Sequence, residues 1–89
     1  MIERELTVGN RLGLHARATA RLVQLLSAYA SKATLSARGR EVNAKSIMGV
    51  LLLAAAPGAT LVLRVEGEDE ADALAACAAL FERRFDEDD

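Results

Sequence analysis

The sequence predicts an α+β domain, a two-layer open-faced sandwich in which three helices cover one face of a four-stranded, mostly antiparallel sheet. Apolar and polar residues alternate in four short segments, which is typical of half-buried strands. Apolar residues recur at helical spacing in three other segments, and the order of all seven is βαββαβα. With 89 residues the chain can bury one modest core, so residues 1–89 are expected to form a single domain.

The first strand and the first helix are separated by a glycine-containing loop. Ile2, Leu6 and Val8 fall on one side of an extended segment, with charged and polar residues on the other. Residues 9–13 are expected to form the loop, and residues 16–29 then place apolar side chains at helical spacing. The buried face of this helix is expected to carry Ala18, Leu22, Leu25, Leu26 and Tyr29.

A hairpin and a short helix are expected in the middle of the chain. Residues 33–37 alternate between apolar and polar as a second strand, and residues 41–44 form a short third strand. The Arg-Gly-Arg sequence at 38–40 joins them as a turn, because its glycine tolerates a positive φ. Ser46 then precedes a helix that starts at Ile47.

The last strand and the last helix complete the two layers. Pro57 and Gly58 end the short helix, and residues 61–65 alternate as the fourth strand. The Gly-Glu-Asp sequence at 67–69 begins the last helix with acidic residues at its positive end. We expect the buried stripe of this helix to consist of Leu74, Ala78, Phe81 and Phe85, and its C-terminal end to carry Arg83 and Arg84.

Composition excludes several classes of protein. Apolar residues make up 52% of the chain, and its only aromatic residues are Tyr29, Phe81 and Phe85, so the core must be aliphatic. The single cysteine, Cys77, excludes an intramolecular disulfide, and one cysteine with one histidine argues against a zinc site, so no metal or other cofactor is expected. The N-terminus lacks the apolar stretch of a secretory signal, and the apolar run at 47–56 is too short for a bilayer. A cytoplasmic protein without membrane insertion is therefore expected.

Charge is unevenly distributed over a chain whose net charge is −2. Residues 1–45 carry a net charge of +5, and residues 46–89 carry a net charge of −7. The basic half contains the only histidine, so the partners of that region are expected to be acidic or phosphorylated. The acidic tail, residues 86–89, is expected to be a solvated and frayed end that aids solubility.

That histidine, His15, lies just after the loop and just before the first helix, in the sequence Gly-Leu-His-Ala-Arg-Ala at 13–18. A helix start offers unpaired backbone N–H groups and a partial positive charge, and both favour a bound anion. Arg17 adds a cation whose donor fork matches phosphate oxygens. The pattern predicts a site that holds a phosphoryl group, and the ordinary alternatives for such a histidine are a polar loop residue or a helix cap.

A second informative segment is the short helix after Ser46, whose hydroxyl can accept a hydrogen bond from a backbone N–H two or three residues on. A helix this short cannot bury all of its apolar side chains, so some should form an exposed docking patch, to which Met48 would adapt. The alternative is a plain cap and a helix packed fully in the core. The apolar side chains concerned are Ile47, Met48, Val50, Leu51, Leu52 and Leu53.

From Ile2 to about Phe85 the chain resembles the HPr family, the histidine-containing phosphocarriers of the bacterial phosphotransferase system. Two motifs carry the resemblance. Gly-Leu-His-Ala-Arg at 13–17 is similar to the phosphorylation site of the family, and Lys-Ser-Ile-Met-Gly at 45–49 is similar to its regulatory serine site. The resemblance implies the fold described above and a covalent phosphoryl relay rather than a stand-alone enzyme.

The resemblance also implies roles for residues in both motifs. Enzyme I, charged from phosphoenolpyruvate, would phosphorylate His15 on Nδ1, and phosphorylated His15 would donate to a histidine of an enzyme IIA domain. Arg17 would steady the phosphoryl group, and the backbone N–H groups of Ala16 and Arg17 would face it. Ser46 would be the target of HPr kinase/phosphorylase, and a transient carrier of this kind is expected to be a monomer. The shared partner surface would consist of Ala16, Ala20, Ile47, Met48 and Leu51.

The chain departs from the family pattern at several positions. Many members have proline where Ala18 stands, and some sugar-transport members have a polar residue at the position of Leu12. Gln24 and Ser27 stand where several members carry lysines. These departures favour a nitrogen-type or regulatory branch of the family over carbohydrate uptake.

Other functional classes fit the sequence less well. A purely regulatory binding protein controlled through Ser46 is the main alternative, but such members have usually lost the histidine that this chain keeps together with Arg17. A module for single-stranded nucleic acid needs aromatic side chains on its strands, and the expected strands carry none. A metabolic enzyme would need an acid–base pair or a cofactor loop around His15, and the sequence offers neither.

Overall fold

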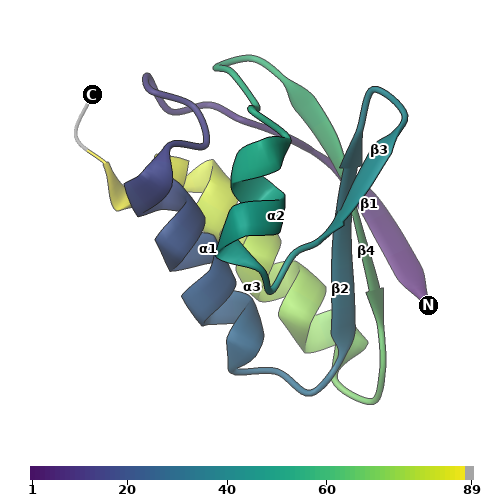
Figure 1. Cartoon of the computed structure of the whole chain (residues 1–89). Coiled ribbons are helices and arrows are strands. Elements are labelled where there is room, and N and C mark those ends of the chain that lie inside the picture. The colour runs from purple at the N-terminus through teal and green to yellow at the C-terminus, as the bar shows by residue number, and fades with distance from the viewer. Residues whose placement is uncertain (88–89) are drawn as a thin grey trace.

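The computed structural model describes residues 1–87 and confirms the predicted two-layer sandwich. Within these residues four strands form one sheet in the order β1-β4-β2-β3, and three α-helices cover one of its faces (Figure 1). Every pairing of neighbouring strands is antiparallel. The strands are β1 (Ile2–Thr7), β2 (Lys32–Ala37), β3 (Arg40–Asn43) and β4 (Thr60–Glu66). The helices are α1 (Ala16–Ser27), α2 (Ile47–Leu52) and α3 (Glu70–Glu82), followed by the 3₁₀ turn η1 (Arg84–Asp86).

The hairpin between β2 and β3 is tighter than the sequence predicted. Ala37 pairs with Arg40, so only Arg38 and Gly39 lie in the turn, with φ angles of 50° and 79°. Two left-handed residues in such a turn match the twist of the flanking strands. The third strand therefore begins at Arg40 and ends at Asn43, one residue earlier at each end than expected.

The hydrophobic core lies between the sheet and the helices. Leu61, Leu63 and Val65, at alternate positions of β4, are fully buried, as the alternation of apolar and polar residues predicted. Burial of a valine or leucine side chain contributes about 1.5–3 kcal/mol to stability relative to its exposure. The buried residues of β4 therefore help to hold the helices on the sheet. The buried side chains of α1 are Ala18, Thr19, Leu22, Val23 and Leu26.

The first helix ends at Ser27, two residues before the predicted limit at Tyr29. The backbone N–H groups of Ala28 and Tyr29 donate to the carbonyls of Leu25 and Leu26, three residues back, at 3.2 and 3.1 Å. Hydrogen bonds of this spacing tighten the last turn and end the α-helix. Tyr29 still packs partly against the core.

The last helix also ends earlier than predicted, at Glu82. Arg83 is its C-cap, and Arg84, Phe85 and Asp86 then adopt left-handed conformations with φ angles of 54°, 58° and 60°. These three residues turn the chain away from the helix axis, so Phe85 is not part of the helical stripe. Its ring is nevertheless fully buried, with its centroid 4.7 Å from that of Phe81.

The buried stripe of α3 differs in its members from the predicted one. Leu74 is only partly buried against the core, while Cys77 is completely enclosed. Burial raises the pKa of the Cys77 thiol to about 12, so this side chain is a neutral packing group. The buried side chains of α3 are Ala73, Cys77, Ala78, Leu80 and Phe81.

The acidic tail departs from the expectation of a frayed end. Asp86 is exposed and pairs with Arg83 at 2.8 Å. Glu87, by contrast, has only 12% of its side chain exposed, because the left-handed turn directs the chain back toward the start of α1. Figure 1 shows the C-terminal turn lying beside that end of α1. The expectation is therefore wrong for Glu87, and residues 88–89 of the predicted tail lie outside the described residues.

Candidate functional site

His15 ends the loop between β1 and α1 and is itself the N-cap of α1. Its backbone N–H donates to the Gly13 carbonyl, and its own carbonyl accepts a hydrogen bond from the Thr19 N–H, both at 2.9 Å. Gly13 has a φ of 72°, and a Cβ at this position would lie 2.6 Å from the Ala55 carbonyl oxygen. Only glycine fits there. The packed loop thus presents the His15 side chain with 27% of its surface exposed.

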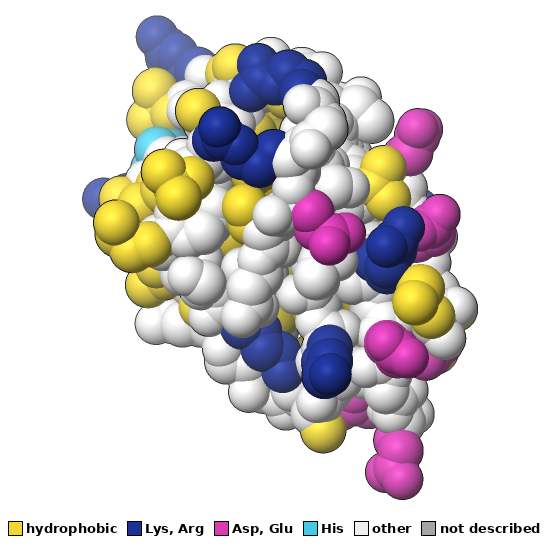
Figure 2. Space-filling model, turned by 45° about the vertical axis from the view of Figure 1, so that its right-hand side comes forward, with side chains coloured by type: hydrophobic (Ala, Val, Ile, Leu, Met, Phe, Trp, Pro, Cys, Tyr) yellow, Lys and Arg dark blue, Asp and Glu magenta, His cyan; other side chains and the backbone are white. Residues whose placement is uncertain are grey.

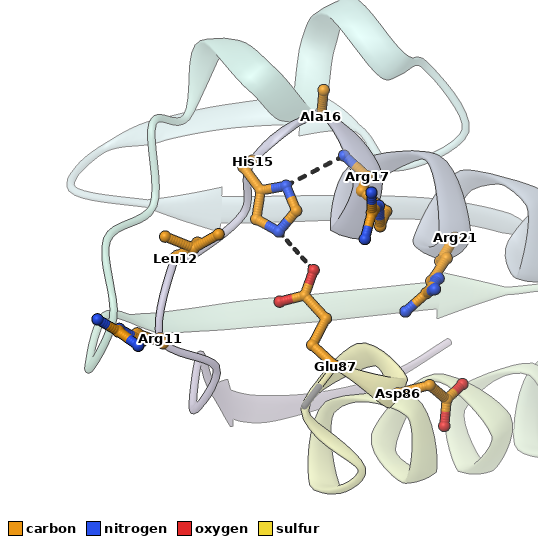
Figure 3. A pocket seen from close by; sticks show the side chains of 8 residues that line it. All are labelled: Arg11, Leu12, His15, Ala16, Arg17, Arg21, Asp86 and Glu87. Carbon is orange, nitrogen blue, oxygen red and sulfur yellow. Dashed lines mark hydrogen bonds and ion pairs between the residues drawn. The ribbon is translucent and has the colours of Figure 1, made fainter. Parts of the chain in front are cut away.

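Both ring nitrogens of His15 have partners (Figure 3). Nδ1 accepts a hydrogen bond from the backbone N–H of Arg17 at 3.2 Å. Nε2 lies 2.5 Å from Oε2 of Glu87. A backbone N–H can only donate and a carboxylate can only accept, so the ring is the neutral tautomer with a lone pair on Nδ1 and its proton on Nε2.

A buried amide holds the Glu87 carboxylate in place. Nδ2 of Asn10 donates to Oε1 of Glu87 at 2.7 Å and to the carbonyl of Gly13 at 2.8 Å. Because both partners are acceptors, the orientation of this amide is determined. Oδ1 of Asn10 has no hydrogen-bond partner among the described residues. The network therefore joins the loop before α1, the histidine ring and the C-terminal turn.

The same contacts keep Glu87 ionised. Hydrogen bonds from Asn10 and His15 lower the pKa of this carboxyl, against the opposing effect of its desolvation, and the charge of Arg21 lowers it further. Arg21 also donates from Nη1 to the Phe85 carbonyl, which ties the C-terminal turn to α1. A charged carboxylate consequently faces the Nε2 proton of His15 at neutral pH.

An open pocket with a volume of about 760 Å³ includes the His15 ring in its wall. The carboxylates Asp86 and Glu87 line one side of it, and its other lining residues are Arg11, Leu12, His15, Ala16, Arg17 and Arg21 (Figure 3). No salt bridge between described residues engages the Arg17 guanidinium. Arginines grouped at a helix N-terminus make a site for an anion, because their charges add to that of the helix end.

The structure brings part of the predicted phosphoryl site together and adds residues to it. His15, Arg17 and Ala16 share the pocket, and the Arg17 N–H lies on Nδ1, the ring atom that the resemblance named. Sequence reasoning found Arg17 but missed Arg21 and Glu87, which also line the pocket. Arg21 could have been found, since it follows Arg17 by one helical turn. Glu87 lies 72 positions from His15, and no local pattern relates the two.

Ser46 lies outside this pocket and caps α2, as predicted. Its Oγ accepts a hydrogen bond from the Gly49 N–H, three residues on, at 3.1 Å. A Cβ at Gly49 would lie 3.3 Å from Ser46 Oγ and from the Asn43 carbonyl oxygen, so glycine lets this cap close tightly. Ser46 itself is partly exposed and can be reached from solvent.

An exposed apolar surface extends over α2. Ile47, Met48 and Leu52 are 45%, 69% and 61% exposed, and Leu12 in the loop before α1 is 68% exposed. Figure 2 shows hydrophobic side chains gathered beside the histidine on this side of the molecule. The helix is therefore not packed fully in the core. Of the docking residues implied by the resemblance, Ala16, Ile47 and Met48 are exposed, while Ala20 and Leu51 are half-buried. Leu52, one of the apolar side chains from which an exposed patch was expected, was not among the docking residues that the resemblance implied, although it follows Met48 by one turn.

Two findings on the part of the chain that the structure describes concern metal ions and membranes. No group of three or more histidine, cysteine, aspartate or glutamate side chains is arranged there to hold a metal ion. None of the described helices is both long and apolar enough to span a bilayer.

Comparison with known proteins connects this site to a family. A family model described as the PTS HPr component phosphorylation site matches residues 2–83. The chain is 62% identical to the phosphocarrier protein HPr of Xylella fastidiosa strain Temecula1, with 99% of each chain covered. It is 38% identical to the phosphocarrier protein NPr of Shewanella violacea, over 97% of this chain and 94% of the relative. The solved structure of HPr-C-His from Thermoanaerobacter tengcongensis matches with a TM-score of 0.96 and 39% identity, with 99% of both chains covered.

Proposed function

Because this chain belongs to the HPr family of phosphocarriers of the phosphotransferase system, we propose that His15 carries a phosphoryl group between two protein partners. Phospho-enzyme I, charged from phosphoenolpyruvate, transfers the group to Nδ1 of His15. A histidine of an enzyme IIA domain then takes it from Nδ1. The observation that carries this proposal is the lone pair on Nδ1, which lies at the N-terminus of α1 in a pocket whose lining includes three arginines.

The relay depends more on the position of the phosphoryl group and on compensation of its charge than on further catalytic groups. Phosphoryl transfer depends mainly on alignment and on electrostatic stabilisation of the moving group. The backbone N–H of Arg17 already points at Nδ1, so it can donate to a phosphoryl oxygen once Nδ1 has formed its bond to phosphorus. The Arg17 guanidinium, which takes part in no salt bridge among residues 1–87, supplies a cation from the same turn.

Regulation through Ser46 is the second part of the proposal. HPr kinase/phosphorylase would add a phosphate to the Ser46 hydroxyl, next to the exposed Ile47 and Met48. A phosphate at a helix N-terminus is locally favourable, so the fold should persist. About two added negative charges beside the apolar surface would repel an acidic partner and slow phosphorylation of His15.

The partner surface in this proposal includes Ala16, Ala20, Ile47, Met48 and Leu51. A small apolar surface with a charged rim suits brief encounters, so we propose that the carrier acts as a monomer in the cytoplasm and binds no nucleic acid. The assignment to a nitrogen-type or regulatory branch, drawn from Leu12, Ala18, Gln24 and Ser27, stays a prediction. The relatives include both an HPr and an NPr, at 62% and 38% identity.

The test is incubation with phosphoenolpyruvate, magnesium and a cognate enzyme I, followed by intact mass measurement. We expect one added phosphoryl mass that is labile in acid and absent from His15→Ala. Ser46→Ala serves as the matched control and should be phosphorylated like the wild type. If a demonstrably active enzyme I adds nothing to the wild type, the relay is excluded. The regulatory binding protein controlled through Ser46 then becomes the better interpretation.

A further inference from the structure

We propose that Glu87 is a positioning residue for His15, and this inference rests on the proposed function. Its carboxylate accepts the proton of Nε2 in a hydrogen bond and thereby keeps the lone pair on Nδ1, the atom that attacks phosphorus. Glu87 does not contact the phosphoryl group in this scheme. It acts through the ring, in the way that a buried carboxylate orients a catalytic histidine in hydrolases.

Contacts from several parts of the fold hold the Glu87 carboxylate beside His15. Oε2 of Glu87 is 2.5 Å from Nε2 of His15, and Oε1 accepts a hydrogen bond from the buried Asn10 amide at 2.7 Å. Arg21 donates to the carbonyl of Phe85, two residues before Glu87, and the Phe85 ring is fully buried. The carboxylate is therefore anchored on its other oxygen and on its backbone. It does not depend on the histidine for its place.

Charge explains why a carboxylate is suited to this position. In the transfer, the bond between phosphorus and the donor histidine of phospho-enzyme I breaks, and the donor nitrogen keeps its electron pair. The lone pair of Nδ1 forms the new bond to phosphorus, while the proton on Nε2 stays where it is. The His15 ring thus becomes positively charged as the bond forms, and the Glu87 carboxylate, 2.5 Å from Nε2, compensates that charge.

The amide of Asn10 makes the glutamine variant more informative than the alanine variant. Because Nδ2 of Asn10 is held by the Gly13 carbonyl, it would still donate to the oxygen of a glutamine at position 87. The amide NH₂ of that glutamine would then face Nε2 of His15, and it can only donate. Because the Arg17 N–H still donates to Nδ1, both ring nitrogens of Glu87→Gln would face donors, and either tautomer would lose one hydrogen bond. Part of the population should therefore carry its proton on Nδ1 and lack the nucleophilic lone pair. Glu87→Ala should leave the Arg17 N–H as the one remaining hydrogen bond of the ring that selects a tautomer.

The first measurement is the protonation of the His15 ring by nitrogen-15 NMR, which is unambiguous because the chain has one histidine. We expect the proton on Nε2 in the wild type, a small share on Nδ1 in Glu87→Ala, where the Arg17 N–H alone selects the tautomer, and a larger share on Nδ1 in Glu87→Gln. Glu82→Gln makes the same chemical change on an exposed residue that pairs only loosely with Arg4, at 3.9 Å, and should match the wild type. Circular dichroism of each variant checks that the fold is retained.

The second measurement is the rate at which phospho-enzyme I phosphorylates each variant. Glu87→Ala should lower the rate roughly 10-fold, the smaller end of the effect of removing a carboxylate partner from a functional histidine, and Glu87→Gln should lower it further. If Glu87 only held the C-terminal turn in place, Glu87→Gln, which has the same shape as the wild type, would not be slower than Glu87→Ala. The proposal is overturned if Glu87→Gln keeps the wild-type tautomer, or if it transfers at least as fast as Glu87→Ala. If the wild type accepts no phosphoryl group, the proposed function fails, while the tautomer measurement still decides the role of Glu87.

Discussion

Two arginines on the first turns of α1 bring positive charge to the His15 pocket, but they have different partners. Arg21 donates to the Phe85 carbonyl and so holds the C-terminal turn. Arg17 lines the same pocket, and no salt bridge with another described residue engages its guanidinium. At the scale of single residues, the first is thus a structural cation and the second is available to a phosphoryl group.

Replacing Arg17 by methionine should separate these roles. The variant keeps much of the apolar stem and loses the donor fork, so we expect phosphorylation of His15 to slow by about 10-fold or more, with an unchanged melting temperature. Arg17→Lys should recover part of the rate, because it restores the charge without the bidentate geometry. Stopped-flow or quench measurements with phospho-enzyme I give these rates.

The matched control for Arg17 is Arg64→Met. Arg64 lies on the exposed face of the sheet and pairs with Glu3 at 3.0 Å, so its loss should leave the transfer rate unchanged. Equal slowing in the two variants would mean that total charge, rather than the position of Arg17, governs the encounter with enzyme I.

The pKa of Glu87 predicts how the stability of the protein changes with acidity. Its folded-state pKa is lowered below the usual value of 4.5, chiefly by the Asn10 hydrogen bond and then by His15 and Arg21. A lowered carboxyl pKa contributes stability that is fully present above the unfolded value and is lost as the pH falls through the folded value. Thermal unfolding of the wild type and Glu87→Ala should therefore differ at pH 7 and converge at low pH. A difference that persists at acidic pH would contradict this assignment.

At the scale of secondary-structure elements, the reversal after α3 links core packing to the site. Phe85→Ala removes a fully buried ring that packs against Phe81, and a loss of about 3–5 kcal/mol of unfolding free energy is expected from such a change. The same variant should loosen Glu87, so a small share of the His15 ring should carry its proton on Nδ1, as expected for Glu87→Ala. Denaturant unfolding and nitrogen-15 NMR of the ring measure the two effects.

A partly buried neighbour provides the comparison for Phe85. Leu74→Ala on α3 should cost less stability and leave the His15 tautomer unchanged, because Leu74 is only partly buried and precedes the turn. If Phe85→Ala lost the expected stability but kept the proton entirely on Nε2, the Asn10 hydrogen bond alone would be sufficient to hold Glu87.

The elements that could be predicted are those whose burial follows a regular period. The alternation at Leu61, Leu63 and Val65 identified β4, and the cap at Ser46 identified the start of α2. The end of α3 could not be predicted, because Arg84-Phe85-Asp86 carries no glycine to mark a left-handed turn, and apolar spacing alone continues the helix.

At the scale of the whole molecule, the left-handed turn after α3 explains why the sequence predicted only part of the site. The local features of His15 and Arg17 depend only on a helix start, so the sequence revealed them. The acidic partner of the ring comes from the other end of the chain, and only the antiparallel fold brings it there (Figure 1). A histidine that looked isolated in the sequence is thus part of a network that joins the N-terminal loop to the C-terminal turn.

The charge distribution of the molecule predicts the effect of a charge at Ser46. Ser46→Asp keeps a competent N-cap, so the fold and melting temperature should be retained. It also places a negative charge beside the exposed Ile47 and Met48, on the surface proposed to dock enzyme I. Repulsion of an acidic partner should raise the KM for this protein by about 5-fold with little change in kcat, and the effect should shrink at high salt.

The neutral cap variant Ser46→Asn decides whether charge is the cause. Asparagine caps a helix as well as aspartate does but adds no charge, so its KM should equal that of the wild type. If Ser46→Asn raised the KM as much as Ser46→Asp, the serine hydroxyl itself would contact enzyme I and repulsion would be the wrong explanation. If neither variant changed the kinetics, the surface over α2 would lie outside the enzyme I interface, and regulation through Ser46 would have to act on a different partner.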